Sequence, residues 1–461
     1  MLGGTAFALG AAFAAIAWLG ELHDHARSFV LLFVGASAAY GLAVAWVVRR
    51  RPAGRWVLWL IVAAAVGFRL LLLPTAPTLS TDVCRYVWDG RLSAAGVSPY
   101  RYLPQAPELA RFRSDWLYSC LNHPDWHTIY PPGAQLLFWG VVRWLSDDIV
   151  VAKAVLVAFD LLTLALVAGW LAAIGRPASW ALLYAWHPLV VVEVAGSGHL
   201  DAVVLATSAA ALWAASRGRE TWAGALIGAA TLVKLYPLIL VAAVVRRRPV
   251  QTLAACAVVI GAGYGLFARE GPAVLGSLGR YVAQEQFNPG LRALLELPLV
   301  PFGPGGRYAA RVLSLVGLAG LASVVAFRAR QAPVEQRALW VVGAYLLATP
   351  SLFPWYALWL VPILAAAPAW PWIHLSCAVS LTYLIFAEPV WHIPRWVTAV
   401  EFVPLALGLA LAIARGRPGW RGGADVRPDA SDGARRGQDR TRPAASPAAT
   451  SRSARPVGLS P

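Results

Sequence analysis

The stretch from residue 80 to residue 91 carries acidic and basic side chains at helical spacing. Asp82 is followed one helical turn later by Arg85, and Asp89 comes one turn after that. The stretch begins just after an apolar segment, so we expect Asp82 at a membrane–water boundary. A carboxylate held there can act as a general base toward a hydroxyl group that approaches from the water. The alternative interpretation is a loop carboxylate paired with a neighbouring Arg, and the spacing alone does not decide between them.

A second polar cluster occupies residues 196–201, with the sequence Gly-Ser-Gly-His-Leu-Asp. Pro188 precedes it and is expected to kink or break its helix, and the glycine turn lets the backbone approach a ligand closely. His199 and Asp201, with Glu193 shortly before them, are therefore candidates to orient a sugar or to bind a metal, or they could simply satisfy each other. Their spacing is poor for a metal site.

The basic residues are almost all arginine, and only two of the 39 Lys and Arg residues are lysines, Lys153 and Lys234. Each lies at the end of an apolar segment. An ammonium group there could bind a lipid-linked phosphate, because Lys presents a compact point charge. The alternative is that both side chains only extend toward lipid headgroups.

The elements that must position these groups are membrane helices. Hydrophobic residues make up 59% of the 461-residue chain, charged residues 13%, and the mean hydropathy is +0.60. A soluble chain carries about 25% charged residues, so this composition argues against a soluble enzyme, a disordered protein or a nucleic-acid-binding protein. Because one span needs about 20 apolar residues, we predict an all-α polytopic membrane protein with about 12–14 transmembrane helices. The net charge of +16 indicates contact with anionic membrane lipids.

Basic clusters between the apolar segments predict the orientation in the membrane. The run 49–51 is expected in the cytoplasm, which puts a long polar loop at 74–133 and a second loop at 269–306 on the outer face. The apolar run 134–146 is short for a span, so we interpret it as an interfacial or re-entrant helix. If it did span, the orientation of every later segment would reverse.

Four cysteines are too few for a disulfide scaffold. Cys84 and Cys120 fall in the same outer loop. They could form a bridge or remain two free thiols, and the sequence leaves both open.

The order of these motifs resembles the GT-C superfamily of membrane glycosyltransferases, especially the polyprenyl-phosphate-mannose-dependent mannosyltransferases and the catalytic subunit of GPI mannosyltransferase I. The matching stretches lie between about residues 80 and 240: Thr81-Asp82-Val83, Gly96-Val97-Ser98-Pro99-Tyr100, Tyr130-Pro131-Pro132, Phe159-Asp160-Leu161-Leu162-Thr163, His187-Pro188-Leu189, Gly198-His199-Leu200-Asp201 and Lys234-Leu235-Tyr236-Pro237.

The resemblance implies an inverting transferase that uses a polyprenyl-phosphate sugar donor on the extracytoplasmic face of the cell inner membrane. The expected sugar is a hexose, mannose first, and the expected acceptor is a lipid or glycan. The family's acidic residue in the first loop maps onto Asp82. Some members carry Asp-x-Asp there, but the second position here is Cys84, so no cofactor is firmly expected and a divalent metal is doubtful.

The resemblance also suggests roles for other residues and a domain organisation. The cations expected to bind the donor phosphate are Lys234, Lys153 and Arg85. The residues expected to contact substrate are Asp89, Tyr100, His199, Asp201 and Tyr236. We expect two additional N-terminal helices in residues 1–55, a catalytic membrane module in 56–414, and a disordered, Arg-rich cytoplasmic tail in 415–461.

Two other classes of protein share part of this pattern. A transporter or flippase for a polyprenyl-linked substrate would have similar hydropathy, but its charges should lie near the membrane midplane. Only Asp160 lies deep within an expected span. A non-catalytic scaffold is disfavoured by the dense polar loop at 74–133.

Overall fold

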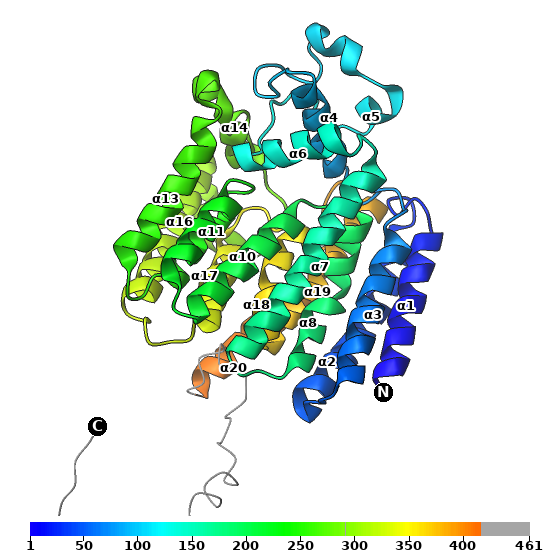
Figure 1. Cartoon of the computed structure of the whole chain (residues 1–461), viewed down its shortest axis with the longest axis vertical. Coiled ribbons are helices and arrows are strands. Elements are labelled where there is room, and N and C mark those ends of the chain that lie inside the picture. The colour runs from blue at the N-terminus through cyan, green and yellow to red at the C-terminus, as the bar shows by residue number, and fades with distance from the viewer. Residues whose placement is uncertain (291, 416–461) are drawn as a thin grey trace, which may run out of the picture. The chain divides into compact units, whose positions relative to one another are not determined.

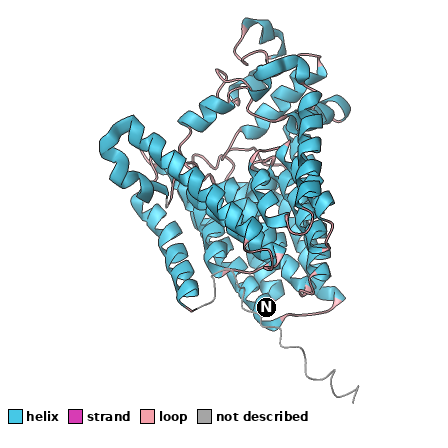
Figure 2. Cartoon of the chain, turned by 90° about the vertical axis from the view of Figure 1, so that its left-hand side faces the viewer, coloured by secondary structure: helices cyan, strands magenta, loops and turns pink. Residues whose placement is uncertain are grey.

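A computed structural model of the protein describes residues 1–290 and 292–415. These residues form helices joined by loops (Figures 1 and 2), and the β pairing among them is one isolated bridge between Phe287 and Ser351. The predicted all-α membrane architecture is therefore confirmed. The predicted tail lies, except for Arg415, outside the described residues.

The N-terminal half contains the helices α1 (Leu2–Trp18), α2 (Ala26–Arg50), α3 (Arg55–Leu72), α4 (Asp82–Ala94), α5 (Asp115–Ser119), α6 (Pro132–Trp144), α7 (Ile149–Ala173), α8 (Leu182–Ala185), α9 (Pro188–Val190), α10 (Asp201–Ser216) and α11 (Glu220–Thr231). Helix α1 packs against α2 and α3, and α10 packs between α7 and α11. Short 3₁₀ helices η1 (Pro107–Phe112) and η2 (Ala178–Ala181) and a π-helical segment η3 (Val191–Gly196) complete this half.

The C-terminal half contains α12 (Val241–Val244), α13 (Pro249–Gly265), α14 (Leu278–Gln284), α15 (Arg292–Glu296), α16 (Gly303–Phe327), α17 (Val334–Ala348), α18 (Val361–Ala366), α19 (Trp370–Ala378) and α20 (Arg395–Ala414). The 3₁₀ segments here are η4 (Tyr236–Leu240), η5 (Ala268–Leu275), η6 (Leu297–Phe302), η7 (Pro354–Leu360) and η8 (Val379–Ala387). Helix α13 packs on α11, and α17 packs on α16.

Six described helical segments are long and apolar enough to cross a membrane, and eight if two bent helix pairs each count as one span. This is fewer than the number predicted from hydropathy. The difference arises because several apolar segments are short or broken. Helix α10 has 16 residues, and the apolar segment around Pro188 is split there into two helical pieces bent by 53°. Pro lacks a backbone N–H and cannot continue the preceding helix.

Apolar side chains cover the outside of several helices. On α16, the side chains of Val312, Leu313, Leu315 and Val316 are exposed. An aqueous surface would disfavour such a patch, whereas lipid tails accept it. These faces are therefore suited to contact the bilayer.

The polar first loop contains α4, η1 and α5, and α4 packs above the bundle against α6, the helix that follows the loop. Figure 1 shows α6 lying across the direction of α7. The close packing depends on Gly90 in α4, because a Cβ atom there would lie 2.5 Å from the backbone oxygen of Phe138 in α6. Helix α6 is the short run predicted to be interfacial, and at 13 residues it is not among the helices long enough to span.

Candidate active site

A cavity of about 650 Å³ lies between the first loop and the ends of the bundle helices. Polar and charged side chains in its lining include Asp82, Arg85, Asn122, Lys234 and Glu285. Aromatic side chains form much of the remaining wall, among them Tyr236, Tyr281, Trp355, Tyr356 and Trp359. The cavity therefore combines a few charged groups with a mostly apolar surface, as ligand sites in proteins do.

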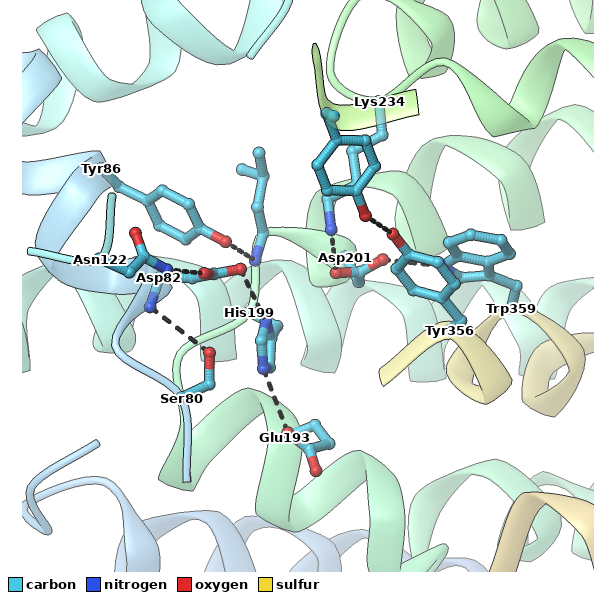
Figure 3. Close-up of polar contacts among 12 residues, drawn as sticks. Ser80, Asp82, Tyr86, Asn122, Glu193, His199, Asp201, Lys234, Tyr356 and Trp359 are labelled. Atoms are coloured by element: carbon cyan, nitrogen blue, oxygen red, sulfur yellow. Dashed lines mark hydrogen bonds and ion pairs between the residues drawn. The ribbon is translucent and has the colours of Figure 1, made fainter. Parts of the chain in front are cut away.

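Asp82 is held at the edge of this cavity by its position in α4 and by Asn122. It is the first residue of α4, where the helix dipole stabilises a negative charge. The Asn122 amide donates a hydrogen bond to Oδ1 at 2.9 Å. The Asp82 side chain is 19% exposed, and Figure 3 shows its carboxylate between Asn122 and His199. Asp82 is thus both fixed in position and accessible.

A buried chain of ionisable groups runs inward from Asp82 (Figure 3). The Oδ2 atom of Asp82 lies 3.8 Å from Nδ1 of His199, and Nε2 of His199 lies 3.2 Å from Oε2 of Glu193. The Tyr383 hydroxyl donates to the other Glu193 oxygen at 2.6 Å. His199 and Glu193 are fully buried. Neither ring nitrogen of His199 has a hydrogen-bond partner among the described residues, so Glu193 contacts the imidazole at ion-pair distance behind Asp82.

The backbone before His199 is shaped to bring it there. Gly198 has φ of +76°, which other residues rarely adopt. A Cβ atom at Gly198 would lie 2.9 Å from Cγ of Lys153 and 3.2 Å from Cβ of Val83. The turn follows the π-helical segment η3, a kind of helix often found at functional sites. The predicted glycine turn is thus observed. The groups that lie close to its backbone are side chains of the protein itself, Lys153 and Val83.

Lys234 forms an ion pair with Asp201 beside the cavity. The ammonium donates to Oδ2 of Asp201 at 2.6 Å, and the Trp359 indole donates to Oδ1 at 2.7 Å. Asp201 is fully buried, whereas the Lys234 side chain is 15% exposed and lines the cavity. An ammonium group has three N–H donors, so two remain for a ligand.

Aromatic rings from the C-terminal half form the far wall of the cavity. The Trp355 ring stacks on the imidazole of His199 with a centroid distance of 4.2 Å. Tyr236 stacks on Trp359, and the hydroxyl groups of Tyr281 and Tyr356 are hydrogen-bonded at 2.5 Å. Trp355 thus covers one face of the His199 ring, and the aromatic wall presents flat apolar surfaces to a ligand.

Glu285 is a second carboxylate in the cavity lining. Burial raises its pKa above the ordinary value, the nearby His123 lowers it, and the negative charge of Asp82 raises it again. The net shift is upward. Glu285 is therefore more readily protonated than an exposed Glu, and its charge near Asp82 depends on pH.

Four of the predicted site residues are engaged in contacts of their own. Arg85 lines the cavity, but its Nε donates to Asp89 at 2.9 Å and its Nη2 donates to the Trp126 carbonyl. Asp89 is fully buried and does not line the cavity; it also accepts from Gln135 at 2.9 Å. The sequence left open that a loop carboxylate pairs with a neighbouring Arg. The structure shows such a pair, and its carboxylate is Asp89 rather than Asp82.

Tyr100 and Lys153 lie outside the cavity lining. The Tyr100 hydroxyl donates to the Tyr130 carbonyl at 2.8 Å, and the side chain is buried. The Lys153 ammonium donates to the carbonyl of Thr75 at 2.5 Å and to that of Leu72 at 3.4 Å, and its side chain is fully buried. Lys153 thus binds backbone of the segment that leads to Asp82, and Tyr100 binds backbone just before α6.

Cys84 and Cys120 form a disulfide with a Cα–Cα distance of 6.1 Å. The bridge joins α4 to the end of α5, and Cys120 is two residues before Asn122. It therefore ties the segment that carries Asn122 to the helix that carries Asp82. Of the two alternatives left open by the sequence, the structure shows the bridge.

Asp160, the charge deep in its helix, has partners from two other segments. It accepts from Nε of Arg69 at 2.6 Å and from the Tyr184 hydroxyl at 2.5 Å. Arg69 also donates to the Ala185 carbonyl at 2.6 Å. These groups are buried and satisfied, so they join α3, α7 and α8 rather than line a passage.

Several residues of the site were not predicted as such. They are Asn122, Glu193, Glu285, Trp355, Trp359 and Tyr383. Glu193 was expected only as part of the polar cluster around His199 and Asp201, not as the partner of His199. The sequence Pro-Trp-Tyr-Ala-Leu-Trp at 354–359 is a visible aromatic signal, but nothing local connects it with the first loop. Within the described part of the chain, no three His, Cys, Asp or Glu side chains are arranged to hold a metal ion.

Residues 127–350 match the model of glycosyltransferase family 87, a GT-C-type family. The matched region is slightly less than half of the chain, and it indicates a membrane glycosyltransferase. It includes His199, Asp201, Lys234 and Tyr236 and begins after Asp82. The resemblance to GT-C enzymes is confirmed, and the finding favours an enzyme over a transporter or a scaffold. Neither the curated proteins nor the solved structures gave a significant match to this glycosyltransferase.

Proposed function

We propose that this glycosyltransferase moves a hexose, specifically mannose, from a polyprenyl-phosphate donor to a lipid or glycan acceptor, with inversion at the anomeric carbon. The acceptor oxygen attacks the anomeric carbon from the face opposite the phosphate. The bond between that carbon and the phosphate oxygen breaks, and its electrons leave with the polyprenyl phosphate. The acceptor proton goes to a carboxylate. Mannose as the sugar rests on the sequence motifs alone.

The observation that carries the proposal is the partly exposed carboxylate of Asp82 at the edge of a large cavity. One carboxylate is sufficient, because the leaving polyprenyl phosphate is a stable anion and needs no general acid. Asn122 occupies Oδ1, so Oδ2 is the oxygen that accepts the proton. His199 lies 3.8 Å from Oδ2 and positions this carboxylate. His199 and Asp201 are fully buried, so we propose that they orient Asp82 and Lys234 rather than contact substrate.

Lys234 is the cation placed best to stabilise the departing phosphate. It lines the cavity, and a preorganised positive charge stabilises negative charge that develops in the transition state. Arg85 also lines the cavity and adds positive charge. We propose Lys234 as the main phosphate-binding residue, with Tyr236 beside it.

The cavity lining continues into an apolar surface suited to a polyprenyl chain. Leu278, Val282, Phe386 and Trp391 belong to this part of the lining. A polyprenyl chain is apolar, and its burial against such side chains is favourable. The donor can therefore place its phosphate near Lys234 and its lipid along these residues.

Two observations support an extracytoplasmic site in the inner membrane. The Cys84–Cys120 disulfide lies next to Asp82, and disulfides persist in oxidising compartments outside the cytoplasm. Arginine clusters, such as 49–51 and 246–248, lie at the ends of helices whose other ends lead to the site. Basic loops favour the cytoplasm, so the site is expected on the other side of the membrane.

The test is a transfer assay with the purified full-length protein in detergent, radiolabelled polyprenyl-phosphate-mannose and a membrane-lipid extract. We expect the wild type to form a labelled product and Asp82→Asn to form none. Asp115→Asn is the matched control, because Asp115 is also the first residue of a helix in the same loop but is exposed and outside the cavity. It should retain full activity. Transfer by a folded Asp82→Asn protein would overturn the assignment of the base, and transfer from polyprenyl-phosphate-glucose alone would overturn mannose.

A further inference from the structure

A second cavity, of about 530 Å³, lies at the other end of the bundle from the catalytic cavity. Its lining comes from the last turns of α7 and α10, from residues 246–247 after α12, and from the first turn of α17. Helix α10 begins at Asp201 beside the catalytic cavity and ends at Ser216 beside this one. At 1.5 Å per residue the two cavities are about 24 Å apart along that helix. The second cavity is therefore a separate site.

A turn of three arginines is fixed at the rim of this cavity by Glu220. The Glu220 carboxylate accepts hydrogen bonds from the backbone N–H groups of Arg246, Arg247 and Arg248, at distances between 2.8 and 3.1 Å. Glu220 is buried and binds the backbone, so its oxygens are already occupied. The three side chains are exposed, and those of Arg246 and Arg247 line the cavity.

Arg337 contributes a buried positive charge to the same cavity. Its side chain lies in the lining and is 3% exposed. Its Nη1 donates to the Val245 carbonyl at 3.0 Å, whereas its Nε has no hydrogen-bond partner among the described residues. A buried guanidinium without a carboxylate within ion-pair distance is costly. An anion in the cavity would remove this cost.

The charges that face this cavity are unbalanced. Four arginines line it, Arg217, Arg246, Arg247 and Arg337, against two carboxylates, Glu220 and Glu335. None of the four is within ion-pair distance of a carboxylate in the described part of the chain, although Glu220 and Glu335 act on Arg337 at longer range. Apolar residues such as Ile174 and Val244 form the rest of the lining.

We infer that this cavity binds a phosphate group, held by Arg246, Arg247 and Arg337. Arginine suits phosphate because its planar guanidinium can donate two parallel hydrogen bonds to phosphate oxygens. The apolar part of the lining admits the glycerol and first acyl carbons of a phospholipid, but a soluble phosphate satisfies the same arginines. The shared chemistry is the phosphate group, and the two sources are separated by experiment.

The test compares two double variants of the full-length protein. Arg246→Gln/Arg247→Gln removes two charges from the cavity lining. Arg219→Gln/Arg248→Gln removes two exposed charges at the same end of the bundle that do not line the cavity, and it is the matched control. Native mass spectrometry in detergent measures retention of added phosphatidylglycerol, with phosphatidylcholine as a zwitterionic reference. Isothermal titration calorimetry measures binding of inorganic phosphate to the same preparations.

We expect the cavity variant to retain phosphatidylglycerol at least about tenfold more weakly than the wild type, and the control variant to bind as the wild type does. Phosphatidylglycerol binding that inorganic phosphate does not displace identifies a lipid headgroup as the ligand. Saturable phosphate binding that the cavity variant loses identifies a soluble phosphate. Equal loss of binding in both double variants would overturn the inference, because the arginines would then act only as a diffuse surface charge. Failure of the wild type to bind either phosphatidylglycerol or phosphate would also overturn it.

Discussion

Asn122 donates a hydrogen bond to Asp82 at 2.9 Å across 40 residues of chain. The donor is two residues beyond Cys120, whose disulfide partner Cys84 is two residues beyond Asp82. The bridge and the hydrogen bond thus join the same two segments. The carboxylate proposed as the base is positioned by a covalent link that lies outside the cavity itself.

We expect Asn122→Ala to reduce kcat by about 10- to 100-fold with little change in the KM for donor. A hydrogen bond to a charged group is worth about 1.5–3 kcal/mol, and its loss leaves Asp82 free to turn away from the acceptor. Steady-state kinetics with the polyprenyl-phosphate donor measure the effect. Ser119→Ala, in the same segment but exposed, should leave kcat unchanged. An equal fall in both variants would point to general damage to the loop.

The disulfide should contribute both stability and activity. Closing a loop of 36 residues is expected to stabilise the protein by about 3–4 kcal/mol. Cys120→Ser should therefore lower the Tm and, by freeing the Asn122 segment, also lower kcat. Differential scanning fluorimetry and the transfer assay test the two effects. The control is Cys256→Ser, which removes a free, buried cysteine far from the loop and should leave kcat intact. If Cys120→Ser left both Tm and kcat unchanged, the bridge would be dispensable.

Glu193→Gln tests whether the buried carboxylate orients His199. The substitution keeps the size of the side chain and removes the charge that holds the imidazole at 3.2 Å. We expect kcat to fall by about tenfold or more while the KM values stay within a few-fold. Glu401→Gln is the control, since Glu401 is another fully buried carboxylate and is bonded to Asn288 instead. If both variants lose activity equally, the effect is one of folding.

The two lysines should behave differently despite their similar sequence settings. Lys234→Met should raise the KM for donor and lower kcat, because Lys234 lines the cavity. Lys153→Met should chiefly lower the Tm, because its ammonium binds the carbonyls of Leu72 and Thr75 and lies outside the lining. Donor titrations and thermal unfolding of both variants measure this. Unchanged donor dependence in Lys234→Met would exclude it as the phosphate-binding cation.

Glu285 should make donor binding depend on pH. Its pKa is raised, so the side chain is neutral below that value and negative above it. A negative charge in the cavity opposes a phosphate donor, so we expect the KM for donor to rise as pH increases through this pKa. In Glu285→Gln the rise should disappear. A pH series from mildly acidic to neutral measures it, and an identical KM profile in the variant would contradict the prediction.

The sequence predicted the helices well because their signal is local. The short apolar run 134–146 corresponds to α6, and the break expected at Pro188 is observed as a bend of 53°. Asp82 was distinguished by its place next to an apolar segment. The number of long spans was overestimated because hydropathy does not register breaks such as that between α11, which ends at Thr231, and η4, which begins at Tyr236. A local hydropathy pattern therefore predicts that a helix is present, but it does not predict whether the helix is continuous.

The partners of the charged residues could not be predicted in the same way. Lys153 and Lys234 look alike in sequence, yet one is enclosed by backbone carbonyls and the other lies beside a cavity. The difference depends on the loop before Asp82 and on Trp359, which is 125 residues beyond Lys234. Such pairings arise only when distant segments pack, and a single sequence contains no signal for them.

The ion pair between Lys234 and Asp201 has a consequence for turnover. A lone ammonium would hold a doubly charged phosphate tightly, and release of the spent carrier would then limit the reaction. With a carboxylate 2.6 Å away, the cation is largely neutralised before the substrate arrives and is neutralised again when the product leaves. In the proposed reaction, Asp201 would compete with the bound phosphate for the charge of Lys234, and this competition would favour exchange of one carrier lipid for the next.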